Sequence, residues 1–91
     1  LGGDGDDERR LLRAYAHLSL GEALQALPLF AELAERNPND PTILEGLRRA
    51  AERTGDRPRE LAALTALAQT ATDDAQAAAL WEAAGALHLA P

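Results

Sequence analysis

The sequence has no cysteine, no lysine, no valine and no methionine. Without cysteine it can form no disulfide, thiol nucleophile, iron–sulfur cluster or cysteine-based zinc site. Without lysine it can form no Schiff base, and it lacks the lysine of a phosphate-binding loop. Sheets favour β-branched and aromatic residues, but the chain has one isoleucine and three aromatic residues. A strand-rich fold is therefore disfavoured.

What remains is a narrow set of strong helix formers. The 91 residues include 21 alanines and 17 leucines, and all nine basic residues are arginine. Ala, Leu, Glu, Gln and Arg have the highest helix propensities. The composition therefore predicts an all-α fold, and the length corresponds to one small domain or a piece of a longer protein.

Charge limits the partners. The net charge is −6, and a surface that neutralises phosphates needs the opposite sign, so nucleic-acid binding is not expected. The charge is uneven, because residues 46–72 hold five arginines against three acidic residues. These arginines could contact an anion or an acidic peptide, although local pairs such as Glu45–Arg49 at helical spacing indicate a solvated face instead.

Membrane insertion is not expected either. The longest uncharged run, residues 61–72, is too short to span a bilayer. No signal peptide is visible, which favours the cytoplasm. The chain begins with Leu1 rather than Met, so the true N-terminus and the compartment both stay open.

The order of helix formers and breakers predicts five helices. Residues 1–7, which are acidic and glycine-rich, are expected to be a linker or tail. The expected helices cover residues 8–19, 23–36, 41–53, 57–71 and 74–90. Asp40 before Pro41 is a typical helix start, and Asp73 with Gln76 resembles a capping box. Pro28 conflicts with this pattern, so the second helix is expected to start later or to be kinked.

The helix pairs recur with a fixed period. The offset from Gly21 to Gly55 also relates Phe30 to Leu64. Ala26, Phe30 and Pro38 reproduce the A-x₃-F…P pattern of tetratricopeptide repeats, whose length of about 34 residues matches this offset. Near the C-terminus, Trp81-x₂-Ala84-Gly85-x₂-His88 corresponds to the other half of that signature, W-x₂-L-G-x₂-Y. The chain therefore resembles the tetratricopeptide repeat family.

This resemblance implies a right-handed α-solenoid of antiparallel helix pairs, with about two and a half repeats in five helices. Repeat 1 would cover residues 8–40 and repeat 2 residues 41–74, and residues 75–91 would be the first helix of a truncated repeat 3. The first repeat departs from the pattern. Its apolar residues fit one position later than the strict frame, as Leu11, Ala14 and Leu18, so the first helix is expected to be shifted.

In this family, the first helix of each pair lines a concave groove. The resemblance therefore implies a module that binds a partner protein or peptide, with the expected partner-binding residues Leu11, Tyr15, Leu18, Glu45, Arg49, Glu52, Glu82 and Leu89. The groove suits a peptide with an apolar anchor and a basic or mixed charge pattern. The residues by which chaperone-type members hold a C-terminal carboxylate are absent, so an acidic chaperone tail is not the expected ligand.

Catalysis is not expected. Ser19, the only serine, lies two residues after His17, and this spacing turns the two side chains apart on a helix. His17 and His88 have no second ligand at metal-binding helical spacing. No cofactor or metal site is therefore predicted.

Two alternatives to the binding module stay open. The chain could be a structural segment of a larger assembly, because the fifth helix has no following partner and would need another chain or a continuation to cover it. It could instead be the sensor or regulatory region of a larger signalling protein. Trp81 could stack on a ligand, but packing between helices is the simpler role. The use of Ala, Arg and Leu, with no Lys, indicates a GC-rich, bacterial-type origin.

Overall fold

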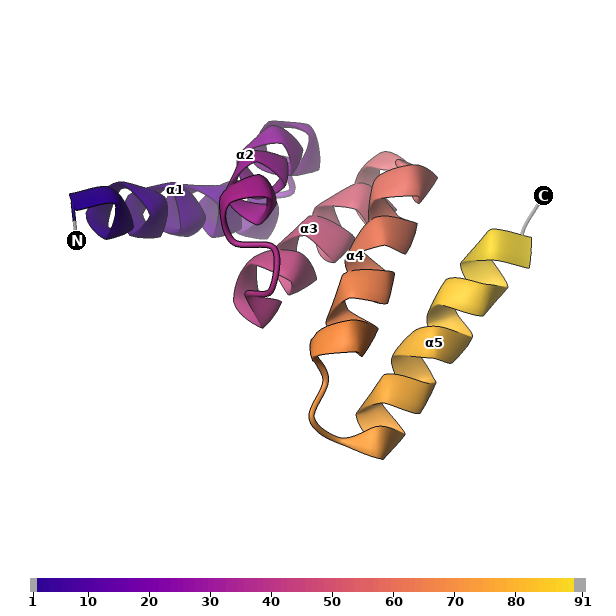
Figure 1. Ribbon diagram of the computed structural model, residues 1–91. Helices are drawn as coiled ribbons and strands as arrows, with labels where there is room; N and C mark the ends of the chain where they lie inside the picture. Colours follow the sequence, from indigo (N-terminus) through magenta and orange to yellow (C-terminus); the bar gives the residue numbers. More distant parts are fainter. Residues whose placement is uncertain (1, 90–91) are drawn as a thin grey trace.

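The structure is a computed structural model that describes residues 2–89, with side chains described for residues 5–86. Its regular elements are all α-helices, as the composition predicted. The five helices are α1 (Gly2–Ser19), α2 (Ala23–Arg36), α3 (Pro41–Thr54), α4 (Arg57–Thr70) and α5 (Asp74–Leu89). They follow one another in a row, with α1 and α5 at opposite ends (Figure 1).

Helix α1 starts at Gly2 rather than near residue 8. Residues 2–7 are therefore helical, not the linker or tail that their composition predicted. The physical reason lies in a distant contact. Arg36 at the end of α2 donates from Nη1 to Oδ1 of Asp7 over 2.9 Å, and the Asn37 amide lies 3.4 Å from Oδ2. These contacts hold the second turn of α1 against the end of α2.

Two glycine turns with the same geometry join α1 to α2 and α3 to α4. Gly21 and Gly55 have φ values of 80° and 76°, in the left-handed region that favours glycine. In each turn, the residue after the glycine donates its amide to a carbonyl of the preceding helix, from Glu22 to His17 over 2.7 Å and from Asp56 to Ala51 over 2.9 Å. The two turns thus have equivalent hydrogen bonds one period apart.

Side chains cap three of the helices. Asp40 accepts a hydrogen bond from the Thr42 amide over 3.0 Å, and Pro41 opens α3, as predicted. Asp73 accepts from the Ala75 amide over 2.8 Å at the start of α5. Asp56 does the same for α4, accepting from the Arg59 amide.

Helix α2 starts at Ala23 and runs through Pro28, so the expectation of a later start is wrong. Pro28 has no amide hydrogen for the carbonyl of Leu24. Both residues are exposed, so that carbonyl lies on the solvent side of the helix.

The core lies between consecutive helices. Within the described part of the chain, each helix packs on its neighbours in sequence, and the one further contact joins α1 to α3. Phe30 and Leu33 are its largest fully buried side chains. Small residues fill the space around them and let the helices approach; those with no exposed surface are Ala14, Ala26, Ala50, Ala51 and Ala63. The radius of gyration is 13.1 Å, slightly above the value of about 12 Å for a globular domain of this length.

The burial pattern of α1 agrees with the shifted frame. Ala14 is fully buried and Leu18 is 4% exposed, while Leu11 is partly buried against the same core.

At the other end of the row, α5 packs on α4 through Ala84 and leaves Trp81 48% exposed. In the part of the chain that the structure describes, no helix has both the length and the hydropathy needed to cross a bilayer.

Candidate functional site

A hollow of about 370 Å³ lies where α1, α3, α4 and α5 come together. Four helices contribute its lining, which consists of Tyr15, Pro41, Thr42, Glu45, Leu67 and Gln76. Apolar surface comes from the tyrosine ring, the proline and the leucine. Polar groups without charge come from Thr42 and Gln76, and Glu45 supplies the one acidic group. This combination of an apolar floor and a few polar groups is typical of a binding site.

Tyr15 forms one wall and also joins three helices. Its ring lies edge-on to Phe30 of α2, with centroids 4.9 Å apart and an interplanar angle of 82°. Its hydroxyl donates to the backbone carbonyl of Thr42 over 2.6 Å, which ties α1 to the start of α3. Burial of the ring raises the pKa of Tyr15 above the usual 10.0. The phenol is therefore a neutral hydrogen-bond donor at neutral pH.

Glu45 forms the acidic wall, but its charge is compensated. Arg48 and Arg49, one helical turn further along α3, both donate to its carboxylate, and the Arg49 Nε lies 3.1 Å from Oε1. The hydrogen bond from Arg48 is the main reason why the pKa of Glu45 is lowered below its usual value of 4.5. The α3 side of the hollow therefore has mixed charge.

The structure brings together only some of the predicted residues. Tyr15 and Glu45 line the hollow. Leu11 packs against the core beside it, whereas Leu18 is buried and lies outside the lining. Leu18 belongs to the core because it lies one turn beyond Ala14, on the face of α1 that packs on α2.

Three of the other four predicted residues lie outside the lining. Arg49 and Glu52 are exposed on α3, and only Arg49 touches a lining residue, Glu45. Glu82 lies two positions from both Leu80 and Ala84, about 200° around the helix from each. Because those residues pack toward α4, Glu82 lies on the opposite face of α5. The side chain of Leu89 lies outside the described residues.

Four lining residues are not among the expected partner-binding residues: Pro41, Thr42, Leu67 and Gln76. Pro41 was expected only as the start of a helix, and Gln76 only as part of a cap. In the structure, Leu67 is 6% exposed at the hollow and Gln76 is exposed on the first turn of α5. Neither position shows a local signal, because the hollow forms only when α4 packs on α3 and α5 packs on α4.

Comparison of the chain with protein-family models, with curated proteins and with solved structures gives no significant match. The residues of the chain itself must therefore indicate what the hollow does. Among the described side chains, no group of three or more His, Cys, Asp or Glu residues is placed to hold a metal ion.

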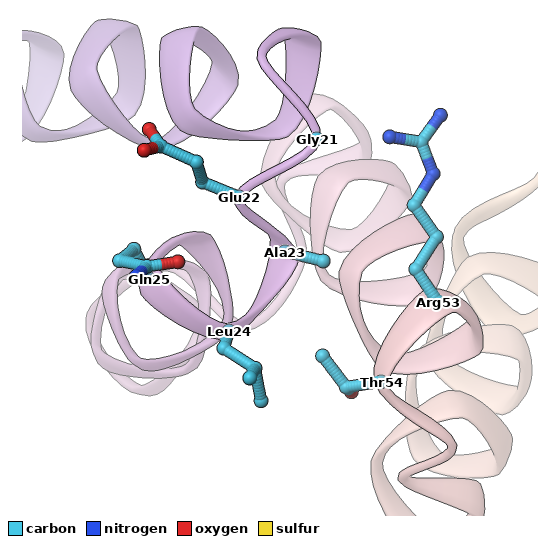
Figure 2. Close-up of a pocket in the computed structure, with 7 residues that line it drawn as sticks. All are labelled: Gly21, Glu22, Ala23, Leu24, Gln25, Arg53 and Thr54. Carbon is cyan, nitrogen blue, oxygen red and sulfur yellow. The ribbon is translucent and has the colours of Figure 1, made fainter.

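A second hollow of about 360 Å³ lies at the opposite end of α3, between the start of α2 and the last residues of α3. Figure 2 shows the α1–α2 turn on one side and the end of α3 on the other, with Leu24 and Ala23 directed toward Thr54 and Arg53. Arg53 donates from Nη1 to the carbonyl of Leu18 over 2.8 Å, so this nitrogen of its guanidinium already has a hydrogen-bond acceptor within the chain. The carboxylate of Glu22 points away from this hollow and lies against His17, with 2.9 Å between Oε1 and Nδ1.

Proposed function

We propose that the chain is a tetratricopeptide-like module, a right-handed solenoid of antiparallel helix pairs, that binds a partner protein or peptide in its concave groove and carries out no catalysis. The observation that carries this proposal is the origin of the first hollow. Three of the four helices that line it are α1, α3 and α5. These are the first helices of successive pairs, which line the concave face in such a stack.

The repeat spacing supports the same proposal. The turns at Gly21 and Gly55 have the same left-handed glycine and equivalent hydrogen bonds. Phe30 and Leu64 are separated by the same offset as these two glycines, and both are buried. Contacts between consecutive helices are those that a solenoid requires.

The lining chemistry defines the expected ligand. The Tyr15 ring, Pro41 and Leu67 offer an apolar surface for one aliphatic or aromatic side chain. Thr42 and Gln76 can exchange hydrogen bonds with a peptide backbone. The mixed charge of α3 favours a peptide that carries a basic residue near Glu45 and an acidic residue near Arg49. We therefore expect a short peptide or helix with one apolar anchor and charges of both signs.

A matched set of glutamine substitutions tests this proposal. Peptides are selected from a displayed library on the unmodified chain, and their affinities are then measured for three variants. Gln76→Trp fills the hollow and should weaken binding by about tenfold or more. Gln69→Trp adds the same ring at an exposed site of α4 outside the hollow and should leave the affinity unchanged.

The third variant, Gln25→Trp, places the ring in the second hollow. Loss of binding in Gln25→Trp but not in Gln76→Trp would move the site to the second hollow. If all three variants bind the peptides with the affinity of the unmodified chain, both hollows are ruled out. Circular dichroism should show the same helix content for each variant, because all three glutamines are exposed.

A further inference from the structure

The outer faces of the first and last helices carry complementary stripes. On α1, Arg9, Leu12, Arg13 and Ala16 follow the i, i+3, i+4, i+7 spacing of one helix face, and all four are exposed. On α5, Ala78, Trp81, Glu82 and Gly85 have the same spacing and are also exposed. We call these sets the α1 stripe and the α5 stripe. Each combines a large apolar residue, a small residue and charge of a single sign.

Arg9 and Arg13 differ from the other arginines of the chain. In the part that the structure describes, they are the two arginines without a hydrogen bond or an ion pair. Glu82 likewise has no ion pair with any described residue. The charges of the α1 stripe and of the α5 stripe are therefore uncompensated and opposite.

The α1 stripe is an open surface. Its residues lie on the side of α1 opposite Ala14 and Leu18, which pack in the core. Leu12, the large apolar residue of the stripe, is 66% exposed. This side of α1 is therefore open to a helix of another copy.

We propose that copies of the chain associate end to end, with the α5 stripe of one copy packed on the α1 stripe of the next. Trp81 and Leu12 supply the apolar contact, and Glu82 lies opposite the two unpaired arginines. Helices α1 and α5, which carry the two stripes, lie at opposite ends of the row (Figure 1), so each copy uses both ends. Such a heterologous contact forms an open chain of copies unless its rotation closes a ring. This surface is separate from the hollow of the proposed function.

One helix against one helix makes a small interface, so the association is expected to be weak and to require high protein concentration. Sedimentation equilibrium of the 91-residue chain should show an average mass that rises with concentration beyond two copies of the 9.7 kDa monomer. Trp81 is the only tryptophan, so its fluorescence should shift to shorter wavelength over the same range. Salt should weaken the association. A chain that stays monomeric at about 1 mM, or stops at two copies, would overturn the proposal.

Charge reversal identifies the two faces. The double variant Arg9→Glu, Arg13→Glu and the single variant Glu82→Arg should each self-associate about tenfold more weakly. When the two variants are mixed, their opposite charges are restored across the interface, and association should return. Glu35→Arg, which reverses an exposed charge on α2, is the control and should associate like the unmodified chain.

A mixture that stays monomeric while both variants keep their helix content contradicts the pairing of these stripes. If the double variant loses its fold, Arg9→Ala, Arg13→Ala removes the charges without introducing repulsion and should still weaken association. Unchanged self-association of that milder variant would also contradict the proposal. Peptide affinity at the first hollow should be the same in all these variants, so the two proposals can fail separately.

Discussion

Gly46 of α3 lies against the ring of Phe30 of α2 so closely that a Cβ atom at residue 46 would overlap the ring carbons Cε1 and Cζ. Phe30 has no exposed surface and cannot swing aside into solvent. The absence of one side chain on α3 therefore sets the distance between α2 and α3. It also fixes the wall on which the Tyr15 ring rests, because that ring meets Phe30 edge-on.

The first prediction concerns this close approach. Gly46→Ala should lower the free energy of unfolding by about 1–3 kcal/mol, because the added methyl group overpacks the α2–α3 interface. The loss is expected although alanine is the better helix former by about 1 kcal/mol. Urea denaturation followed by circular dichroism measures it.

Gly85→Ala is the matched control, since a Cβ there meets no atom within 4 Å. It should raise the stability of α5 by about 0.5–1 kcal/mol. In a Phe30→Leu background, the cost of Gly46→Ala should fall, because the overlapping ring is gone. A cost that stays the same with Phe30→Leu would show that the ring does not set the spacing.

The second prediction concerns the hydroxyl of Tyr15. Tyr15→Phe keeps the ring contact with Phe30 but removes the bond to the Thr42 carbonyl. We expect a loss of about 0.5–1 kcal/mol in the free energy of unfolding, at the low end for a hydrogen bond because this one is exposed. Tyr15→Leu also removes the edge-on ring pair and should cost more. Equal losses for the two variants would assign the effect to the hydroxyl alone.

The chain also allows Tyr15 to be titrated in isolation. It has one tyrosine, no lysine and no cysteine, so between about pH 9 and 11 no other side chain changes its charge. Because the folded pKa is raised above 10.0, the unfolded chain loses this proton first as the pH rises. The stabilising contribution is therefore complete below pH 10.0 and is lost as the pH rises through the folded pKa.

Absorbance of the phenolate at 295 nm should thus give a higher midpoint for the folded chain than for the chain in denaturant. Stability should fall as the pH rises above 10.0 in the unmodified chain and stay flat in Tyr15→Phe. A midpoint at or below 10.0 in the folded chain would show that Tyr15 is not buried against Phe30 as described.

The contrast between local and distant contacts explains what the sequence could predict. Turns and caps depend on neighbours within a few residues, so Gly21, Gly55, Asp40 and Asp73 indicated helix ends that the structure confirms. The shift of α1 was predictable for the same reason, because its apolar spacing is local. The geometry of the hollow could not be predicted from the sequence, since Leu67 and Gln76 line the same hollow as Tyr15 only after α4 and α5 have packed.

The third prediction concerns the mixed-charge wall. Arg48 and Arg49 hold the pKa of Glu45 below 4.5, so Glu45 stabilises the folded state above that pH and loses this effect as the pH falls through the folded pKa. Glu45→Gln should therefore cost about 0.2–1 kcal/mol at pH 7 and less at pH 3. The expected loss of stability is small because the Glu45 side chain is 33% exposed and solvent screens its contacts with the arginines. Urea denaturation at the two pH values gives the difference.

Glu35→Gln removes an exposed carboxylate of α2 for which no ion pair is described, and it serves as the control. It should show no comparable difference between pH 7 and pH 3. A Glu45→Gln variant that is equally destabilised at both pH values would place its contribution in packing rather than in the arginine contacts.

The last prediction concerns the start of α1, where sequence and structure differ. The composition of residues 2–7 indicates a tail, yet Asp7 is held by Arg36 and Asn37 from the end of α2. Asp7→Ala should release these turns, and amide exchange over residues 2–10 should become about two- to fivefold faster. Asp6→Ala removes the neighbouring exposed carboxylate, which has no described ion pair, and should change exchange less. Because both variants alter the charge at the helix start equally, only the contact with Arg36 separates them. Equal acceleration would show that the helix dipole, rather than this contact, keeps residues 2–7 helical.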